Sequence, residues 1–260
     1  SSGLPGRTTG GEVQDDLTNL IQTRDKKDWN DAMKSAVHNV ANGRPTAADI
    51  KMVTDALIKS GQFEVAQKAH PGLSDSETIR MMQWDHGVGI DCAGYVQEAF
   101  LAANGGTRAD YRLDPDPMNE NLSSLKGNPN FTQVKPENVK PGDLIILDPP
   151  KKNDVGHTVL VRDHHVASKN ELKDLHDSGH FAKPGDVIHL YEVDASFGAG
   201  KTGDLNGGLQ RKTWVYNETT GKWGQLAPYP SIPPSLEMVE SDRSGPYDHP
   251  MNGIFHPKGK

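Results

Sequence analysis

The chain has 260 residues, a net charge of −7 at pH 7 and a mean hydropathy of −0.68, and its apolar run LIIL at 144–147 excludes a wholly disordered chain. The acidic excess argues against phosphate backbones, so we expect neither nucleic acid nor a membrane as partner; no stretch reaches the roughly 18 apolar residues that span a bilayer. The single cysteine excludes an intrachain disulfide framework and a cysteine-rich zinc site.

The N-terminal part of the chain is predicted to be helical after a short lead-in. Residues 1–12 are rich in Gly, Ser and Thr, lack the features of a signal peptide, and are expected to be flexible. Apolar residues then recur with helical spacing, and Thr46 precedes one such stretch as a candidate N-cap. Residues 13–75 are therefore predicted to form short helices, either as a plain packing module or as a docking, inhibitory or delivery module.

Residues 76–260 are predicted to form a second domain, in which helices give way to strands. A helix follows Cys92 and ends near Asn104, and a long surface excursion is expected near 105–140. The turn sequence KPGD occurs twice, before apolar runs at 144–147 and 187–193, and further strands are predicted at 156–161, 209–216, 222–224 and 253–255. A second insertion is expected near 163–183. Helices followed by an antiparallel sheet predict an α+β fold.

Cys92 opens the apolar helical stripe in GIDCAGYVQEAF, with Asp91 as a candidate N-cap. A lone cysteine is often only a small buried apolar residue. As a nucleophile it would need the thiolate form, which a helix N-terminus favours, and a nearby base. Among the histidines, His157 is the best candidate for that base because it begins an apolar strand. Asp194, at the end of a later strand, is the candidate to orient it, and His189 is a rival on the opposite face of that strand.

Four motifs in this order resemble those of the NlpC/P60 cysteine peptidases: DCAGYV at 91–96, PGDLI at 141–145, GHTV at 156–159 and VDAS at 193–196. The resemblance spans roughly residues 84–216. It implies a papain-like α+β core in which the helix carrying the cysteine packs on the antiparallel sheet. It further implies Cys92 as nucleophile, His157 as base and acid, Asp194 in the third polar position, Asp91 and Trp84 as substrate-binding residues, and no cofactor.

The chain departs from the family pattern at positions that bear on substrate choice. Ala93 stands where the family usually has a serine that helps to bind the free amine of the substrate, and Asp194 stands where it often has histidine. Between His157 and Asp194 the family often has a short hairpin, whereas this chain has an insertion. The sequence therefore indicates the type of reaction more clearly than the substrate.

The resemblance implies a thiol hydrolase that cleaves an amide bond in the stem peptides of bacterial peptidoglycan, either as a cell-wall enzyme or as a secreted antibacterial effector. The expected location is secreted, periplasmic or in the cell wall, with a peptidoglycan peptide as substrate and an inhibitor or immunity protein left open as a partner. Two alternatives remain: a toxin that deamidates or cross-links a glutamine of a host protein, and a noncatalytic binding module on the same fold.

Two further groups of residues are of types that occur in metal or substrate sites. His176 and His180 are four residues apart, as two zinc ligands on a helix would be, but no closed ligand set is evident and we expect a solvated insertion without metal. The aromatic residues Trp214, Tyr216 and Trp223 would suit a substrate groove, but packing within the sheet is the favoured interpretation.

Overall fold

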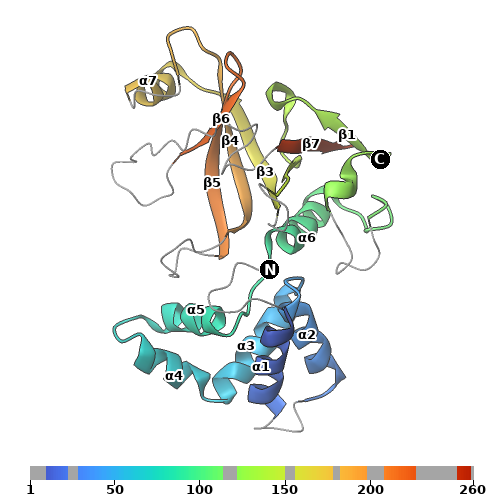
Figure 1. The fold of residues 1–260 in the computed structure, drawn as a ribbon, viewed down its shortest axis with the longest axis vertical. Helices are drawn as coiled ribbons and strands as arrows, with labels where there is room; N and C mark the ends of the chain where they lie inside the picture. Colours follow the sequence, from blue (N-terminus) through green and yellow to red (C-terminus); the bar gives the residue numbers. More distant parts are fainter. Residues whose placement is uncertain are drawn as a thin grey trace. The chain divides into compact units, whose positions relative to one another are not determined.

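The computed structural model describes residues 10–22, 29–113, 122–149, 156–177, 182–197, 208–226 and 251–258. The α+β class predicted from the sequence is confirmed (Figure 1). The α-helices are α1 Gly10–Gln22, α2 Asp31–Ala41, α3 Ala47–Lys59, α4 Gln62–Ala69, α5 Asp75–Asp85, α6 Cys92–Asn104 and α7 Lys169–Asp177. The strands are β1 Phe131–Val134, β2 Leu144–Leu147, β3 His157–Val166, β4 Ile188–Phe197, β5 Gly208–Asn217, β6 Lys222–Gln225 and β7 Met251–Pro257, with short 3₁₀ helices η2 Leu122–Leu125 and η3 Pro136–Asn138.

The chain divides into two compact units. The first comprises residues 1–95 with 196–209, and the second comprises residues 96–195 with 210–260. Helices α1 to α5, blue to teal in Figure 1, belong to the first unit, and the described strands belong almost wholly to the second. The division falls inside α6, beyond the boundary near residue 75 that the sequence predicts.

Several helices of the first unit begin where the sequence provides a side-chain cap. Thr46 and Asp49 form a reciprocal capping box at α3, and Ser74 and Glu77 form another at α5, so each pair satisfies backbone donors that a helix start leaves open. The predicted N-cap at Thr46 is thereby confirmed. The apolar stripes of these helices meet in one core, made of Val13, Leu17, Ile21, Met33, Ala36, Val37, Val40, Ala41, Val53, Ala56, Leu57, Ala66, Met82 and Val88.

The second unit is built on a seven-stranded sheet of order β1-β7-β2-β3-β4-β5-β6, and the strand pairs whose register is described are antiparallel. The strands predicted from alternating and apolar runs are present. The expected surface excursion at 105–140 is only partly correct, because it contains β1 and buried aromatic rings. Phe131 of β1 and Tyr111 pack against Phe100 of α6, with ring centroids 5.6 and 4.8 Å from that ring.

The predicted insertion at 163–183 also holds more regular structure than expected. β3 continues to Val166, and α7 follows, its first turn closed by Glu171, which accepts a hydrogen bond from the backbone N–H of Ser168 at 2.8 Å. Leu175 of α7 is buried against Ile188, Leu190 and Val215. The helix was missed because most of its residues are charged, so its apolar stripe is short.

The two KPGD sequences form the same turn. In each, the backbone N–H of the lysine donates to the aspartate carboxylate at 2.9 Å, and the glycine has a positive φ, +94° at Gly142 and +96° at Gly185. Proline followed by a glycine of positive φ is typical of a type II turn. The environments differ, since Asp143 is fully buried while Asp186 is at the surface.

The pKa values of these two carboxyl groups shift in opposite directions. Burial raises the pKa of Asp143, against hydrogen bonds from Lys140 and His256 that lower it. The backbone hydrogen bond from Lys183 and the side chain of Asn217 lower the pKa of Asp186. His256 Nδ1 lies 2.5 Å from Asp143 Oδ1, so the first turn also ties β2 to β7. The same local sequence thus serves a buried junction in one place and a surface turn in the other.

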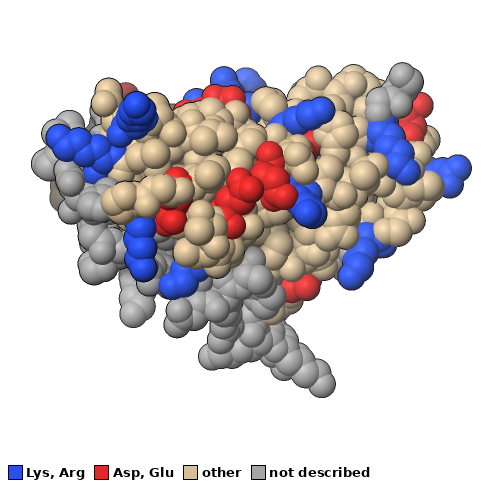
Figure 2. All heavy atoms as spheres, turned by 90° about the horizontal axis from the view of Figure 1, so that it is seen from above, with Lys and Arg blue, Asp and Glu red and all other residues tan. Residues whose placement is uncertain are grey.

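Among the described residues, none of the helices combines the length and the apolar character needed to cross a bilayer. On the face shown in Figure 2, acidic and basic side chains are interspersed, and those of the described residues form no continuous basic surface there. Such a surface is what proteins that bind phosphate backbones present.

We predict that Gly142→Ala and Gly185→Ala each lower the free energy of unfolding by about 1–2 kcal/mol, because an alanine is strained at a positive φ. Gly89→Ala is the control, since a Cβ there would have no heavy atom within 4 Å and its φ lies outside the left-handed region. Urea denaturation of the three variants measures the difference. Equal stabilities of all three would contradict the prediction.

Candidate functional site

Cys92 is the first residue of α6, and its side chain is partly exposed. The carbonyl of Asp91 accepts the first helical hydrogen bond, from the N–H of Tyr95 at 3.0 Å, and the Asp91 carboxylate accepts the N–H of Gly94 at 2.6 Å. The predicted N-cap is therefore confirmed. Val96 lies one turn beyond Cys92 and is completely buried, so Cys92 stands at the solvent end of the apolar stripe.

The turn between α2 and α3 contacts this helix start. The carbonyl of Gly43 accepts the backbone N–H of Asp91 at 3.0 Å, and Arg44 forms an ion pair with the Asp91 carboxylate. A Cβ on Gly94 would lie 2.5 Å from the Gly43 carbonyl oxygen, so only glycine allows this approach. Sequence reasoning missed Arg44, because no local pattern signals a contact between residues 47 positions apart.

Asp91 and Trp84, the predicted substrate-binding residues, both have structural contacts in this region. The Asp91 carboxylate already binds Arg44 and the N–H of Gly94, which does not support a direct bond to a substrate amine. Trp84 lies in the last turn of α5, is partly buried, and its carbonyl accepts the N–H of Gly87 at 3.1 Å. A role in substrate binding stays a prediction for both.

His157 is the first residue of β3 and lies opposite Leu147 of β2. A central strand fixes the backbone of a residue more firmly than a loop does, as the prediction of a positioned base requires. Cys92 falls in the first unit of the chain and His157 in the second. Their pairing therefore stays a prediction.

Asp194, the predicted orienting group, lies directly opposite Leu160 in the β3–β4 pair. Residues directly opposite share a face of the sheet, and His157 is three positions before Leu160, so His157 and Asp194 point to opposite faces. The Asp194 carboxylate lies 2.9 Å from Arg211 Nε and 3.6 Å from Arg162 Nη1. This geometry does not support Asp194 as the residue that orients His157, and it gives Asp194 a role in surface ion pairs.

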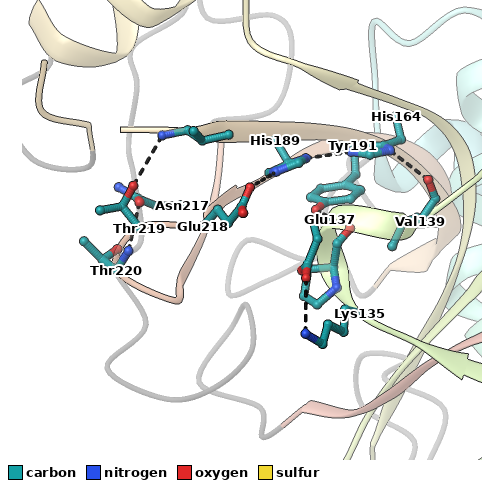
Figure 3. Close-up of polar contacts among 12 residues, drawn as sticks. Lys135, Glu137, Val139, His164, His189, Tyr191, Asn217, Glu218, Thr219 and Thr220 are labelled. Atoms are coloured by element: carbon teal, nitrogen blue, oxygen red, sulfur yellow. Dashed lines mark hydrogen bonds and ion pairs between the residues drawn. The ribbon is translucent and has the colours of Figure 1, made fainter. Parts of the chain in front are cut away.

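A chain of polar contacts crosses the other end of the same sheet (Figure 3). His164 Nδ1 lies 2.8 Å from the carbonyl oxygen of Val139, and His164 Nε2 lies 2.9 Å from His189 Nδ1. His189 Nε2 lies 2.9 Å from Glu218 Oε2, where this series of contacts reaches the surface. We call these four residues the histidine relay.

The partners of the histidine relay restrict the directions of its hydrogen bonds. The Val139 carbonyl only accepts, so His164 donates from Nδ1. Between the two rings, one nitrogen donates and the other accepts, and His189 Nε2 faces the carboxylate of Glu218. The arrangement therefore links a buried ring to a surface carboxylate through hydrogen bonds.

Aromatic rings enclose the histidine relay. The Tyr191 ring stacks on His164 at 4.8 Å and packs against Trp223 at 5.2 Å, and the Tyr191 hydroxyl donates to the carbonyl of Pro136 at 3.0 Å. Trp223 packs edge to face with Trp214, and both are almost completely buried. The favoured interpretation of these tryptophans as sheet packing is confirmed.

Burial has a clear effect on the groups that titrate in this cluster. It lowers the pKa of His164, assisted by the nearby His189 and His165, and it raises the pKa of Tyr191 above its ordinary value. The lowered pKa favours the neutral form of His164. By register, His189 shares a sheet face with His157, but His164 lies seven residues along β3 from His157, about 23 Å. The rival His189 is thus too distant to orient His157.

The sequence spacing of His176 and His180 is that of two zinc ligands on a helix, although no metal is expected there. His180 lies outside the described residues, so the structure does not test that pair. Within the described part of the chain, no three His, Cys, Asp or Glu side chains come together as metal ligands would.

Comparisons of this chain with protein-family models, with curated proteins and with solved structures find no match.

We predict that the histidine relay makes the stability depend on pH below about 6.5, the ordinary pKa of histidine. The lowered pKa of His164 in the fold means that the unfolded chain binds protons more readily, so stability is present above that pH and falls as the pH decreases. His164→Phe, which keeps a ring against Tyr191, should reduce this slope. Urea denaturation between pH 7.5 and 5.5 measures it.

The control for this prediction is His38→Ala, because His38 is an exposed histidine of α2, in the other unit of the chain. The charged and titratable groups facing His164 are His189, His165 and Asp163, and all of them remain in both variants. An unchanged slope in His164→Phe would show that His164 is not the group responsible.

Proposed function

We propose that this protein is a thiol hydrolase that cleaves an amide bond, with Cys92 as nucleophile and His157 as general base and acid. One observation carries the proposal: the predicted nucleophile and the predicted base each occupy the first residue of a regular element, Cys92 in α6 and His157 in β3. The order of the motifs that resemble the NlpC/P60 peptidases supports it, and we extend the proposal to a papain-like core.

The position of Cys92 is suited to nucleophilic attack. The unpaired N–H groups and the dipole at a helix N-terminus stabilise a negative charge, which favours the thiolate over the thiol. Cys92 is also only partly buried. A structural cysteine would gain nothing from either property.

The proposed reaction has two steps. His157 takes the thiol proton as Cys92 Sγ attacks the carbonyl carbon, and the Cys92 backbone N–H helps to bind the resulting oxyanion. His157 then gives the proton to the leaving amine as the C–N bond breaks. Water, deprotonated by His157, attacks the thioester, releasing the carboxylic acid and restoring the thiol. Asp194 has no part in this scheme, and the group that orients His157 is not assigned.

We propose a peptide bond in the stem peptides of bacterial peptidoglycan as the substrate, which places the protein outside the bacterial cytoplasm. This part of the proposal rests on the family resemblance. Ala93 has no hydroxyl to offer a substrate amine, and the Asp91 carboxylate is engaged by Arg44. The bond cleaved within the stem is accordingly left open.

We predict that the protein releases fragments from purified peptidoglycan and that Cys92→Ala abolishes their release, because no other side chain of the chain provides a thiol. His157→Ala should reduce the rate by about 10²–10⁴-fold, the usual contribution of a general base. His165→Ala is the matched control and should retain full activity, since its side chain is 46% exposed and lies at the far end of β3. Mass spectrometry of the soluble fragments measures release.

The same assay separates the cell-wall substrate from the alternatives. Absence of fragments with a folded wild-type protein would reject peptidoglycan as the substrate. Release of ammonia from glutamine-containing proteins, dependent on Cys92, would instead favour the deamidase. Activity that persists in Cys92→Ala would reject thiol chemistry altogether.

A further inference from the structure

We infer that Arg44 is a positioning residue for Cys92: it neutralises the Asp91 carboxylate that caps α6 and thereby keeps the thiolate of the nucleophile favourable. The inference rests on the proposed function for its catalytic meaning. Its physical content concerns only Arg44, Asp91 and Cys92, which all belong to the first unit of the chain. Neither the sequence motifs nor the family resemblance includes Arg44.

The capping residue creates an electrostatic problem for the nucleophile. Asp91 directly precedes Cys92, and its carboxylate is used to cap the helix through the N–H of Gly94 at 2.6 Å. A negative charge one residue from a thiol opposes the formation of a thiolate. The helix dipole alone would have to overcome this repulsion.

Arg44 resolves the problem because it forms an ion pair with the same carboxylate oxygen that caps the helix. The Arg44 side chain is only 13% exposed and that of Asp91 27%, so water screens the pair less than a fully exposed one. The pair as a whole carries no net charge. The Asp91 carboxylate can thus accept the capping hydrogen bond without a net negative charge beside Cys92.

The backbone holds Arg44 in this place. The carbonyl of the preceding residue, Gly43, accepts the Asp91 N–H at 3.0 Å, and the N–H of Arg44 donates to the carbonyl of Asn39 at 2.9 Å. The turn between α2 and α3 is therefore fixed to the helix start on one side and to α2 on the other. The N-terminal helices contribute directly to the surroundings of the nucleophile, beyond the docking, inhibitory or delivery role expected from the sequence.

The test is the pH profile of Cys92 alkylation by iodoacetamide, followed by intact mass. The chain has a single cysteine, so each alkylation event reports this thiol. Arg44→Gln keeps a hydrogen-bond donor for Asp91 but removes the charge. We expect it to move the midpoint of the profile upward by about one pH unit, which is about a tenfold slower alkylation at neutral pH.

Three further variants separate charge from structure. Arg44→Lys restores the charge and should return the rate to within about threefold of wild type. Arg44→Gln combined with Asp91→Asn removes both charges and keeps a capping side chain, so the midpoint should return toward wild type. Lys51→Ala is the control, because Lys51 is 75% exposed in a surface pair with Asp55.

The inference is overturned if Arg44→Gln leaves the alkylation profile unchanged. It is also overturned if the double variant is shifted as far as Arg44→Gln, because removing the charge of Asp91 would not rescue a purely structural role of Arg44. Alkylation needs no substrate, so this outcome is independent of hydrolysis. A shifted and rescued profile without peptidoglycan cleavage would support the inference and reject the proposed substrate. Peptidoglycan cleavage by the wild type with an unshifted alkylation profile in Arg44→Gln would overturn the inference and support the proposed substrate.

Discussion

The capping of α6 by the Asp91 carboxylate is the interaction on which the candidate site depends. It determines where the helix begins and so makes Cys92 its first residue, at the end of an apolar stripe in which Val96 and Phe100 are buried. The same carboxylate binds Arg44 from the turn between α2 and α3. One side chain thus joins the helical region to the start of the helix that carries the cysteine, and it does so with a charge that has to be compensated.

Burial and charge compensation recur in the sheet. Asp143 and Asp186 occupy identical turns, yet burial raises the pKa of Asp143 while hydrogen bonds from Lys183 and Asn217 lower that of Asp186. In the histidine relay, burial lowers the pKa of His164, whose ring contacts the Val139 carbonyl and His189. In each case the local sequence supplies the polar groups, and burial together with hydrogen bonding sets the direction of the pKa shift.

Features encoded by neighbouring residues were predicted well from the sequence. The cap at Thr46, the helix that begins at Cys92 and both KPGD turns depend on contacts within a few residues, so their sequences suffice. Strand β1 and helix α7 were missed because each is short and has few apolar residues of its own. Both are stabilised by burial against partners distant in the sequence, which periodicity within one segment does not reveal.

The sequence by itself determined the α+β class, the start of the helix at Cys92 and the strand that begins at His157, because propensity, capping and turn chemistry act locally. Only the tertiary structure decided the pairing of strands and the partners of charged groups. Register sets Asp194 on the opposite sheet face from His157, and a turn 47 residues away supplies Arg44 to Asp91. These outcomes depend on long-range packing, in which a shift by one residue reverses the face of a whole strand.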